Sequence, residues 1–314
     1  MLVWLPFLTR EEAIAQVGPM PPGVEFEVAS REHGLPLATA DRVEWFAVRN
    51  FEVEVARQVL ALEAPNLRWL QLASAGYDYI VDDVPPRVGL CNAAGVHDVG
   101  TSELAVALAL AHLNGVDRYA LDRPGRAFAP HYGRTLADRR ALILGYGRIG
   151  RAVERRLMGF DVTSVTRVAQ HSRTDPEVHA VGDLPRLLPD ADIVFVTAPA
   201  TAQTRHLLDA AALALLPDGA VVVNVGRGNV VDTSALVAEL GRITAALDVT
   251  DPEPLPEDHP LWASPHVTWT PHVGGWSGAF HARYARLIQA QLARLAAGER
   301  PLNVVRDPAP GVPA

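Results

Sequence analysis

The sequence contains a single cysteine, Cys91, and no long hydrophobic run. One thiol excludes an intramolecular disulfide and a metal site built from several thiolates. No apolar run approaches the roughly 20 residues that a membrane-spanning helix needs. The apolar start, residues 1–7, lacks the basic segment and the small-residue cleavage site of a secretory signal peptide. We therefore expect a soluble, cytoplasmic protein without a bound metal.

Basic stretches are also missing. Lysine and arginine together number 28, against 36 aspartates and glutamates, which gives a formal net charge of −8. An acidic chain without a basic patch is a poor partner for nucleic acid or for an anionic membrane surface. The 314 residues, of which 49% are hydrophobic, are enough for two domains with separate cores.

Strand-like and helix-like segments alternate along the first third of the chain. Short apolar runs predict strands over residues 2–7, 24–29, 43–48, 67–72 and 88–92. Apolar residues at helical spacing predict helices over 10–17 and 51–62. Such alternation predicts a parallel sheet covered by helices.

The rest of the chain continues this pattern after a different kind of segment. Residues 121–140 are rich in proline, glycine and arginine, which predicts an irregular connector. Strands are predicted over 141–144, 162–166, 193–197, 220–225, 243–249 and 267–270. Helices are predicted over 101–110, which is apolar on nearly every face, and over 151–160, 233–240 and 277–297.

A glycine-rich turn links the strand at 141–144 to the helix that follows. Its glycines, Gly145, Gly147 and Gly150, have the spacing G-x-G-x-x-G. In a dinucleotide site the first allows the tight turn, the second lets the backbone approach the pyrophosphate, and the third lets helix and strand pack closely. The alternative is an ordinary glycine-rich turn, but the strand before and the helix after favour a cofactor site.

Three later strands end in polar residues within apolar surroundings. Arg227, Glu253 and His272 each follow one of these strands. Ligands of open α/β sheets bind at the carboxyl ends of the strands, so we expect the three side chains to converge on one edge. The alternatives are a surface ion pair for Arg227, a solvated loop charge for Glu253 and a structural role for His272.

In these motifs the chain resembles the D-isomer-specific 2-hydroxyacid dehydrogenases, including glyoxylate/hydroxypyruvate reductases and phosphoglycerate dehydrogenases. The resemblance covers most of the length and rests on residues 74–78, 92–103, 145–150, 224–232, 248–256 and 271–275. It implies two doubly wound α/β domains with parallel sheets. A Rossmann cofactor domain, 95–276, would be inserted in a flavodoxin-like substrate domain made of 1–94 and 277–314. It also implies a homodimer in which the region around 101–140 reaches the partner.

The family pattern implies that Arg227, Glu253 and His272 are catalytic. A guanidinium fork can hold the carboxylate of a 2-keto acid and polarise its carbonyl oxygen. A histidine imidazolium can donate a proton to that oxygen as hydride arrives from the nicotinamide. A carboxylate on the other ring nitrogen would fix the tautomer and stabilise the charged ring.

The resemblance extends the predicted site beyond the catalytic set. Substrate contacts are expected from backbone N–H groups at Ala75, Gly76, Gly95 and Val96, beside Arg227. Cofactor contacts are expected, besides the three glycines, from Thr101, Arg148, Ile149, Thr166, Arg167, Thr197, Val225, Gly226, Asp248 and Gly274.

We expect NADP(H) to be preferred to NAD(H). An NAD-selective fold of this type places an acidic residue at the end of the second strand, about 20 residues after the first glycine. With a strand over 162–166, Thr166 or Arg167 takes that position, and neither would repel a 2′-phosphate. Arg167, together with Arg173, could bind it. The alternative is that Arg167 is a solvated charge and NAD is accepted without selection.

Two further readings stay open. The family includes cofactor-sensing corepressors that keep the fold and even the catalytic residues, and turnover would separate them from an enzyme. The related formate dehydrogenases pair their histidine with glutamine, so Glu253 argues against that branch. The chain departs from the pattern at Thr250, where an aromatic residue is common, and at Trp276, which could narrow the pocket or cap a helix.

Overall fold

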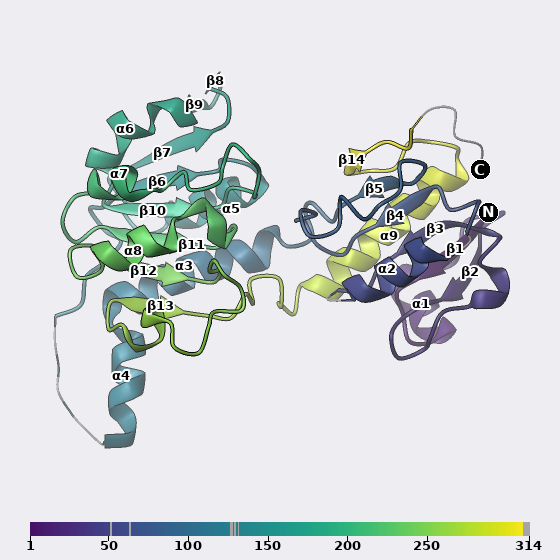
Figure 1. The fold of residues 1–314 in the computed structure, drawn as a ribbon, viewed down its shortest axis with the longest axis horizontal. Helices are drawn as coiled ribbons and strands as arrows, with labels where there is room; N and C mark the ends of the chain where they lie inside the picture. Colours follow the sequence, from purple (N-terminus) through teal and green to yellow (C-terminus); the bar gives the residue numbers. More distant parts are fainter. Residues whose placement is uncertain (51, 63, 126–127, 129, 131, 310–314) are drawn as a thin grey trace. The chain divides into compact units, whose positions relative to one another are not determined.

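The computed structural model describes residues 1–50, 52–62, 64–125, 128, 130 and 132–309. The chain divides into two compact units (Figure 1). The first comprises residues 1–97 with 278–314, and the second comprises 98–277. No described helix is long and apolar enough to cross a membrane.

The first unit is built on a six-stranded sheet with the order β14-β5-β4-β3-β1-β2. Its strands are β1 (Leu2–Leu5), β2 (Glu25–Val28), β3 (Val43–Ala47), β4 (Trp69–Gln71), β5 (Gly89–Cys91) and β14 (Val304–Arg306). β14 pairs with β5 in antiparallel fashion, and every other pair is parallel. Without β14, the order is that of flavodoxin-like sheets, as the family resemblance implied.

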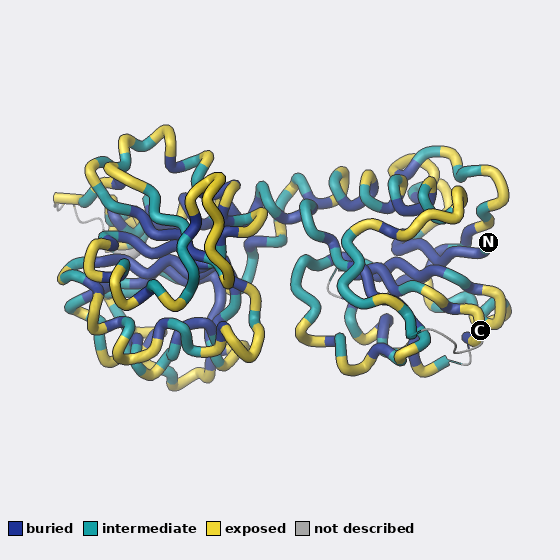
Figure 2. The backbone as a smooth tube through the Cα atoms, turned by 90° about the horizontal axis from the view of Figure 1, so that it is seen from above, coloured by how far each residue is buried: buried dark blue, intermediate teal, exposed yellow. Residues whose placement is uncertain are grey.

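Helices cover both faces of this sheet. α2 (Val53–Ala61) packs on one face through Val55 and Val59. α1 (Arg10–Val17) and α9 (Phe280–Ala296) pack on the other, where Val17, Phe280 and Ile288 share one core. Figure 2 shows the result as buried strands inside an exposed shell.

The second unit contains an eight-stranded sheet with the order β13-β12-β11-β10-β6-β7-β9-β8. Its strands are β6 (Arg140–Leu144), β7 (Ser164–Ala169), β8 (Arg173–Thr174), β9 (Glu177–Ala180), β10 (Ile193–Val196), β11 (Val221–Asn224), β12 (Thr244–Leu247) and β13 (Val267–Trp269). All pairs except β8–β9 are parallel. The six central strands, in the order β9-β7-β6-β10-β11-β12, have the strand order of the Rossmann fold.

Helices again lie on both faces of the sheet. α3 (Asp98–Asn114) and α5 (Arg148–Leu157) share a core with β6, β10 and β11 on one face. α6 (Leu184–Leu187), α7 (Ala210–Ala214) and α8 (Thr233–Glu239) contribute to the core on the other. The predicted two-domain α/β architecture is therefore present.

Four local predictions need correction. β7 begins at Ser164 and continues to Ala169, so it is shifted toward the C-terminus relative to the predicted 162–166. α5 begins at Arg148 rather than Arg151, so Gly150 lies inside its first turn. The β8–β9 hairpin was not predicted, because its residues carry little apolar periodicity. The predicted connector over 121–140 is partly helical, since α4 covers Val116–Asp122 and a short 3-10 helix covers Arg123–Gly125. Within it, positions 126, 127, 129 and 131 lie outside the described residues.

The first division between the units falls after His97 rather than after residue 94. His97 is buried, its Nε2 lies 2.7 Å from the carbonyl oxygen of Ala73, and its ring stacks on Phe280 at 5.4 Å. These contacts tie it to the first unit and give it a structural role there. The second division falls after residue 277 rather than after 276.

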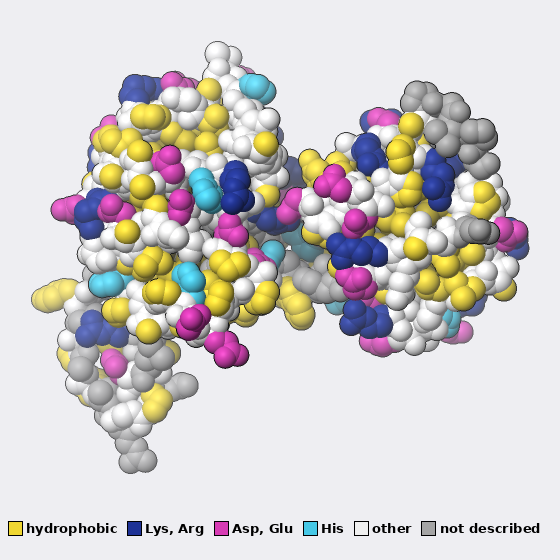
Figure 3. All heavy atoms as spheres, viewed as in Figure 1, with side chains coloured by type: hydrophobic (Ala, Val, Ile, Leu, Met, Phe, Trp, Pro, Cys, Tyr) yellow, Lys and Arg dark blue, Asp and Glu magenta, His cyan; other side chains and the backbone are white. Residues whose placement is uncertain are grey.

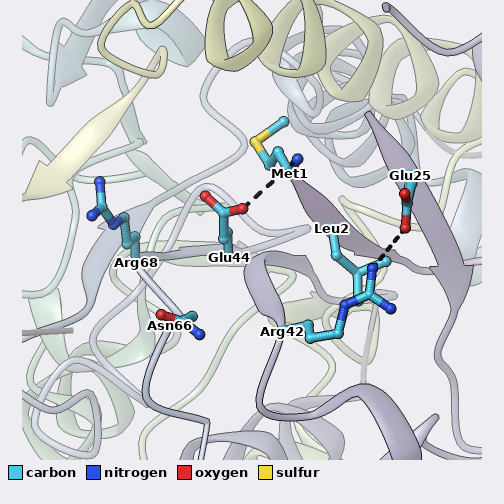
Figure 4. A pocket seen from close by; sticks show the side chains of 7 residues that line it. All are labelled: Met1, Leu2, Glu25, Arg42, Glu44, Asn66 and Arg68. Atoms are coloured by element: carbon cyan, nitrogen blue, oxygen red, sulfur yellow. Dashed lines mark hydrogen bonds and ion pairs between the residues drawn. The ribbon is translucent and has the colours of Figure 1, made fainter. Parts of the chain in front are cut away.

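A polar pocket of about 330 Å³ lies in the first unit beside the residues that begin β1, β2 and β3 (Figure 4). Arg42 pairs with Glu25 at 2.8 Å, and Glu44 faces the Met1 amino group at 3.8 Å. Ligands of open α/β sheets bind at the opposite, carboxyl ends of the strands. This pocket therefore lies at the opposite end of the sheet from the loops after β4 and β5, where substrate contacts are predicted.

Candidate active site

The glycine-rich turn has the local geometry that a dinucleotide site needs. Gly145 has φ +101°, and a Cβ there would lie 2.4 Å from the amide nitrogen of Ala198. A Cβ on Gly150 would lie 2.8 Å from the carbonyl oxygen of Gly145. Neither position accepts a larger residue, because the turn and the start of α5 are packed against the sheet.

Gly147 differs from the other two glycines. A Cβ on Gly147 would have no neighbour closer than 3.9 Å, so the backbone here borders open space. Gly147 caps α5, whose first N–H groups and dipole favour an anion at this end. These residues fit a cofactor pyrophosphate, which requires close approach to a bare backbone. Two predicted cofactor residues lie beside the turn. Thr197 Oγ1 donates to Gly145 O at 2.8 Å, and Arg148 Nε donates to Asp98 Oδ2 at 3.0 Å.

Arg227 leaves the end of β11 from a turn that is tightly packed on both sides. A Cβ on Gly226 would lie 2.6 Å from Ala198 O, and one on Gly228 would lie 1.9 Å from Thr250 O. The buried Asn224 side chain donates to Arg227 O and accepts from Gly226 N, both at 3.1 Å. The backbone that carries the half-buried guanidinium is therefore fixed by packing, which argues against a loosely held surface charge. Asn224 was not singled out from the sequence.

Asp248, directly after β12, organises the turn that carries His272. Its Oδ1 accepts hydrogen bonds from Thr270 Oγ1 (2.7 Å) and Val273 N (2.8 Å). Its Oδ2 accepts from Gly274 N at 2.9 Å. The His272 N–H donates to the Asp248 backbone oxygen at 2.7 Å. A carboxylate that accepts three hydrogen bonds while only 2% exposed is a rigid support.

His272 is held in the left-handed region, with φ +54°. That conformation is uncommon for a residue with a side chain, and it persists where the surroundings over-determine it. His272 Nδ1 lies 2.5 Å from Glu253 Oε1, and the two side chains are 43% and 42% exposed. Since a carboxylate only accepts, the proton of this bond sits on Nδ1, and Nε2 takes no part in it. The predicted Glu253–His272 pair is therefore formed.

Comparison with known proteins identifies the family. The family model described as "D-isomer specific 2-hydroxyacid dehydrogenase, NAD binding domain" matches residues 106–274. The chain is 33% identical over 267 residues to a glyoxylate reductase from Pyrococcus horikoshii, covering 77% of each chain. The chain belongs to the D-isomer-specific 2-hydroxyacid dehydrogenase family. Its activity class is that of an oxidoreductase with a nicotinamide cofactor.

Two solved structures of this family share the fold. A D-isomer-specific 2-hydroxyacid dehydrogenase from Xanthobacter autotrophicus Py2, in complex with NADPH and MES, aligns with a TM-score of 0.77 and 29% identity over 97% of this chain and 98% of that chain. A family member from Aeromonas salmonicida aligns with a TM-score of 0.83 and 26% identity, again over 97% and 98%.

The residues predicted to contact the substrate by their backbones lie in the first unit, after β4 and β5. Asn92 ties the two loops together, because its Nδ2 donates to Ala75 O at 2.7 Å and its Oδ1 accepts from Ala94 N at 3.1 Å. Ser74 Oγ donates to Gly76 O at 2.7 Å. Gly95 has φ +98°, and Val96 is buried in the core. Carboxylate binding by their N–H groups stays a prediction.

Thr166 and Arg167 do not occupy the end of the second strand. Both lie inside β7, where Arg167 pairs in register with Ile143. The Arg167 guanidinium donates to Glu154 Oε1, with Nε at 2.8 Å, and lies over the Tyr146 ring. Burial of the Glu154 carboxyl acts to raise its pKa, but hydrogen bonds from Arg167 and Tyr146 lower it overall. Glu154 is therefore ionised near neutral pH and balances the Arg167 charge.

The strand instead ends at Ala169, and the turn 170–172 leads to Arg173. The Arg173 Nη2 donates to the backbone oxygen of Tyr146 at 2.9 Å, next to the glycine turn. No acidic residue stands at positions 169–172. The absence of a carboxylate at the strand end therefore holds for the corrected boundary.

The cysteine and another, half-buried histidine lie outside this site. Burial raises the pKa of the Cys91 thiol to about 12, which keeps it protonated and unreactive. His112 Nδ1 lies 2.9 Å from Thr268 Oγ1, and burial lowers the pKa of its ring. It serves as a structural contact between α3 and β13. Among the described residues, no group of three or more histidine, cysteine, aspartate or glutamate side chains could hold a metal ion.

The Asp248 carboxylate is expected to be essential for the geometry of His272. An Asp248→Asn substitution turns one acceptor oxygen into an NH2 group that faces N–H or O–H donors, which costs about 1–3 kcal/mol for a buried group. We expect a lower Tm and a fall in kcat of at least about tenfold. Asp218→Asn, on an exposed carboxylate, is the matched control. Unchanged kcat and Tm in Asp248→Asn would contradict the role.

Proposed function

We propose that this protein is a reductase of small 2-keto acids that also oxidises the matching D-2-hydroxy acids. The observation that carries the proposal is the His272–Glu253 pair, clamped by Asp248 after β12 and β13. Arg227 follows the neighbouring strand β11. A cation for the carboxylate, a carboxylate for the imidazole and a proton donor for the keto oxygen therefore follow three consecutive strands of one sheet, β11, β12 and β13. We expect the protein to work in the cytoplasm.

The bound nicotinamide would supply a hydride to the keto carbon. His272 would deliver a proton from Nε2 to the keto oxygen, on which negative charge develops during reduction. Glu253 holds Nδ1–H and stabilises the ring while it is positively charged. Arg227 binds the substrate carboxylate in a bidentate fork and draws electron density toward the oxygen. In the reverse direction, His272 accepts the hydroxyl proton.

A cofactor-sensing protein on the same fold is the alternative from another class. It would bind NAD(P)H without consuming it. Oxidation of NAD(P)H in the presence of glyoxylate, hydroxypyruvate or pyruvate separates the two, because only the enzyme depends on the keto acid.

His272→Gln is expected to lower kcat by on the order of a hundredfold or more, because glutamine cannot donate a proton in the transition state. Arg227→Ala is expected to raise KM as well as lower kcat, because the carboxylate loses its partner. Steady-state kinetics on the best keto acid measure both. His281→Gln, in the exposed first turn of α9, controls for the loss of a histidine. Near-normal kcat and KM in either site variant would refute the assignment.

We further propose a preference for NADPH over NADH, with Arg173 in place of Arg167 as the phosphate contact. Arg173 lies beside the glycine turn, whereas the Arg167 charge is balanced by Glu154. Arg151, in the first turn of α5, lies over the Tyr146 ring at 5.7 Å and adds positive charge. A guanidinium there can make charge-assisted bonds to a 2′-phosphate.

Arg173→Ala is expected to lower kcat/KM for NADPH by about tenfold or more while changing that for NADH little, since only NADPH has the 2′-phosphate. Arg186→Ala, another exposed arginine of the same unit, should change neither. The measurement is kcat/KM for each cofactor at saturating keto acid. A wild-type ratio that favours NADH would overturn the preference.

The protein is also proposed to be a homodimer that uses the region around α4. Large hydrophobic side chains are exposed there, namely Val116, Tyr119, Phe128 and Tyr132, the last two almost completely. An apolar set of this size on one segment is typical of a protein interface. Light scattering at micromolar concentration should return twice the chain mass of 33.8 kDa. The monomer mass would refute the dimer, and Tyr132→Asp should shift the equilibrium toward it.

A further inference from the structure

A second cavity, which no sequence motif indicates, adjoins the His272–Glu253 pair. It has a volume of about 310 Å³ and lies within the second unit, between the segment after β12, the 3-10 helix Pro260–Ala263 and the end of β13. Figure 3 shows hydrophobic side chains beside histidine and acidic side chains over this part of the unit. We refer to it as the tryptophan pocket, after Trp262 and Trp269 in its wall.

Apart from Asp248, Thr250, Glu253 and His272, the pocket is lined by apolar side chains. Trp262 and Trp269 pack edge to face with ring centroids 4.6 Å apart. The Trp262 Nε1–H donates to Pro256 O at 2.7 Å, so the indole offers the pocket carbon rather than an unmet donor. Leu255 completes this wall. An apolar group placed against this wall would be removed from water without costing the Trp262 N–H its hydrogen bond.

Thr250 forms the side of the pocket nearest β12. Its hydroxyl donates to Pro252 O at 2.9 Å, so the remaining surface is its methyl group. The small side chain leaves the pocket open where a larger residue at 250 would reach into it. The volume is about twice the roughly 150 Å³ of a cavity that holds benzene.

The polar end of the pocket is catalytic in the proposed function. His272 and Glu253 both line it, and Nδ1 of the ring is occupied by Glu253. A 2-keto acid that presents its oxygen to His272 can therefore extend its other substituent along Leu255, Trp262 and Trp269. Glyoxylate has only hydrogen at that position and would leave the apolar surface unused.

We propose that the tryptophan pocket receives the side chain of the substrate, and that the preferred 2-keto acids carry an aromatic or branched apolar group. This inference rests on the proposed reductase activity and names its substrate class. Phenylpyruvate and 4-methyl-2-oxopentanoate represent the class, and glyoxylate and pyruvate represent substrates that do not fill the pocket.

The test is kcat/KM for these four acids with NADPH and NADH. We expect phenylpyruvate to exceed glyoxylate by at least about tenfold, because a single methylene in an apolar pocket already contributes about 10–200-fold. Thr250→Phe fills the pocket and should lower the phenylpyruvate/glyoxylate ratio by about tenfold or more. Thr163→Phe, at an exposed position of the same unit, should leave the ratio unchanged.

Trp262→Ala provides an independent variant if phenylalanine at 250 disturbs the fold. Trp262 is half exposed, and its truncation should raise KM for phenylpyruvate more than KM for glyoxylate. The inference would be overturned if glyoxylate is turned over and the phenylpyruvate/glyoxylate ratio of kcat/KM is near one and unchanged in Thr250→Phe and Trp262→Ala. The reductase activity itself would still stand. Failure of every keto acid to support NAD(P)H oxidation would instead refute the proposed function, and the inference with it.

Discussion

The site of this dehydrogenase depends on one buried carboxylate. Asp248 accepts hydrogen bonds from Thr270, Val273 and Gly274 and so fixes the backbone on both sides of His272. His272 can therefore keep a left-handed backbone conformation, which costs roughly 1–3 kcal/mol and which an unsupported loop would relax. Because the ring is nearly half exposed, its position comes from this backbone support and from Glu253, and burial contributes little.

Close packing supports the neighbouring strand ends in the same way. Gly228 approaches the backbone of Thr250 so closely that no side chain fits between them, which links the turn of Arg227 to the segment that leads to Glu253. Asn224 bonds the same turn from within. The turns that carry Arg227 and His272 are thus both packed or bonded against the segment after β12. In the proposed function this support keeps the cation and the proton donor in place for a reaction that needs both at once.

Most of the fold could be predicted from the sequence because buried parallel strands are short apolar runs separated by helices. The helix-covered parallel sheets followed from these runs, whereas the inserted Rossmann domain, the flavodoxin-like domain and the Glu253–His272 pair followed from the family resemblance of the motifs after the strands. Strand ends were harder, since β7 continues through Arg167, a charged residue that finds its partner in Glu154 on α5. Only the tertiary structure shows that Arg167 forms an ion pair with Glu154, which leaves Arg173 beside the glycine turn as the proposed phosphate contact.

The supporting contacts and the tryptophan pocket lay beyond the reach of sequence reasoning. The sequence around Asp248 does not show whether its carboxylate contacts a cofactor or accepts hydrogen bonds from three backbone and side-chain donors. Trp262 and Trp269 come into contact only because the chain folds back after β12. Thr250 was recognised as a departure from the family pattern, but its consequence depended on what faces it across the cavity.

In the proposed function, Glu253 and the Asp248-supported turn hold His272 with the proton on Nδ1 and Nε2 available for the substrate. Nitrogen-15 NMR of the histidine side chains in the intact protein tests this tautomer directly. We expect a slowly exchanging Nδ1–H signal that disappears in His272→Gln and loses its protection in Glu253→Ala. A His272 ring protonated only on Nε2, or one that exchanges freely between tautomers in the unsubstituted protein, would contradict it.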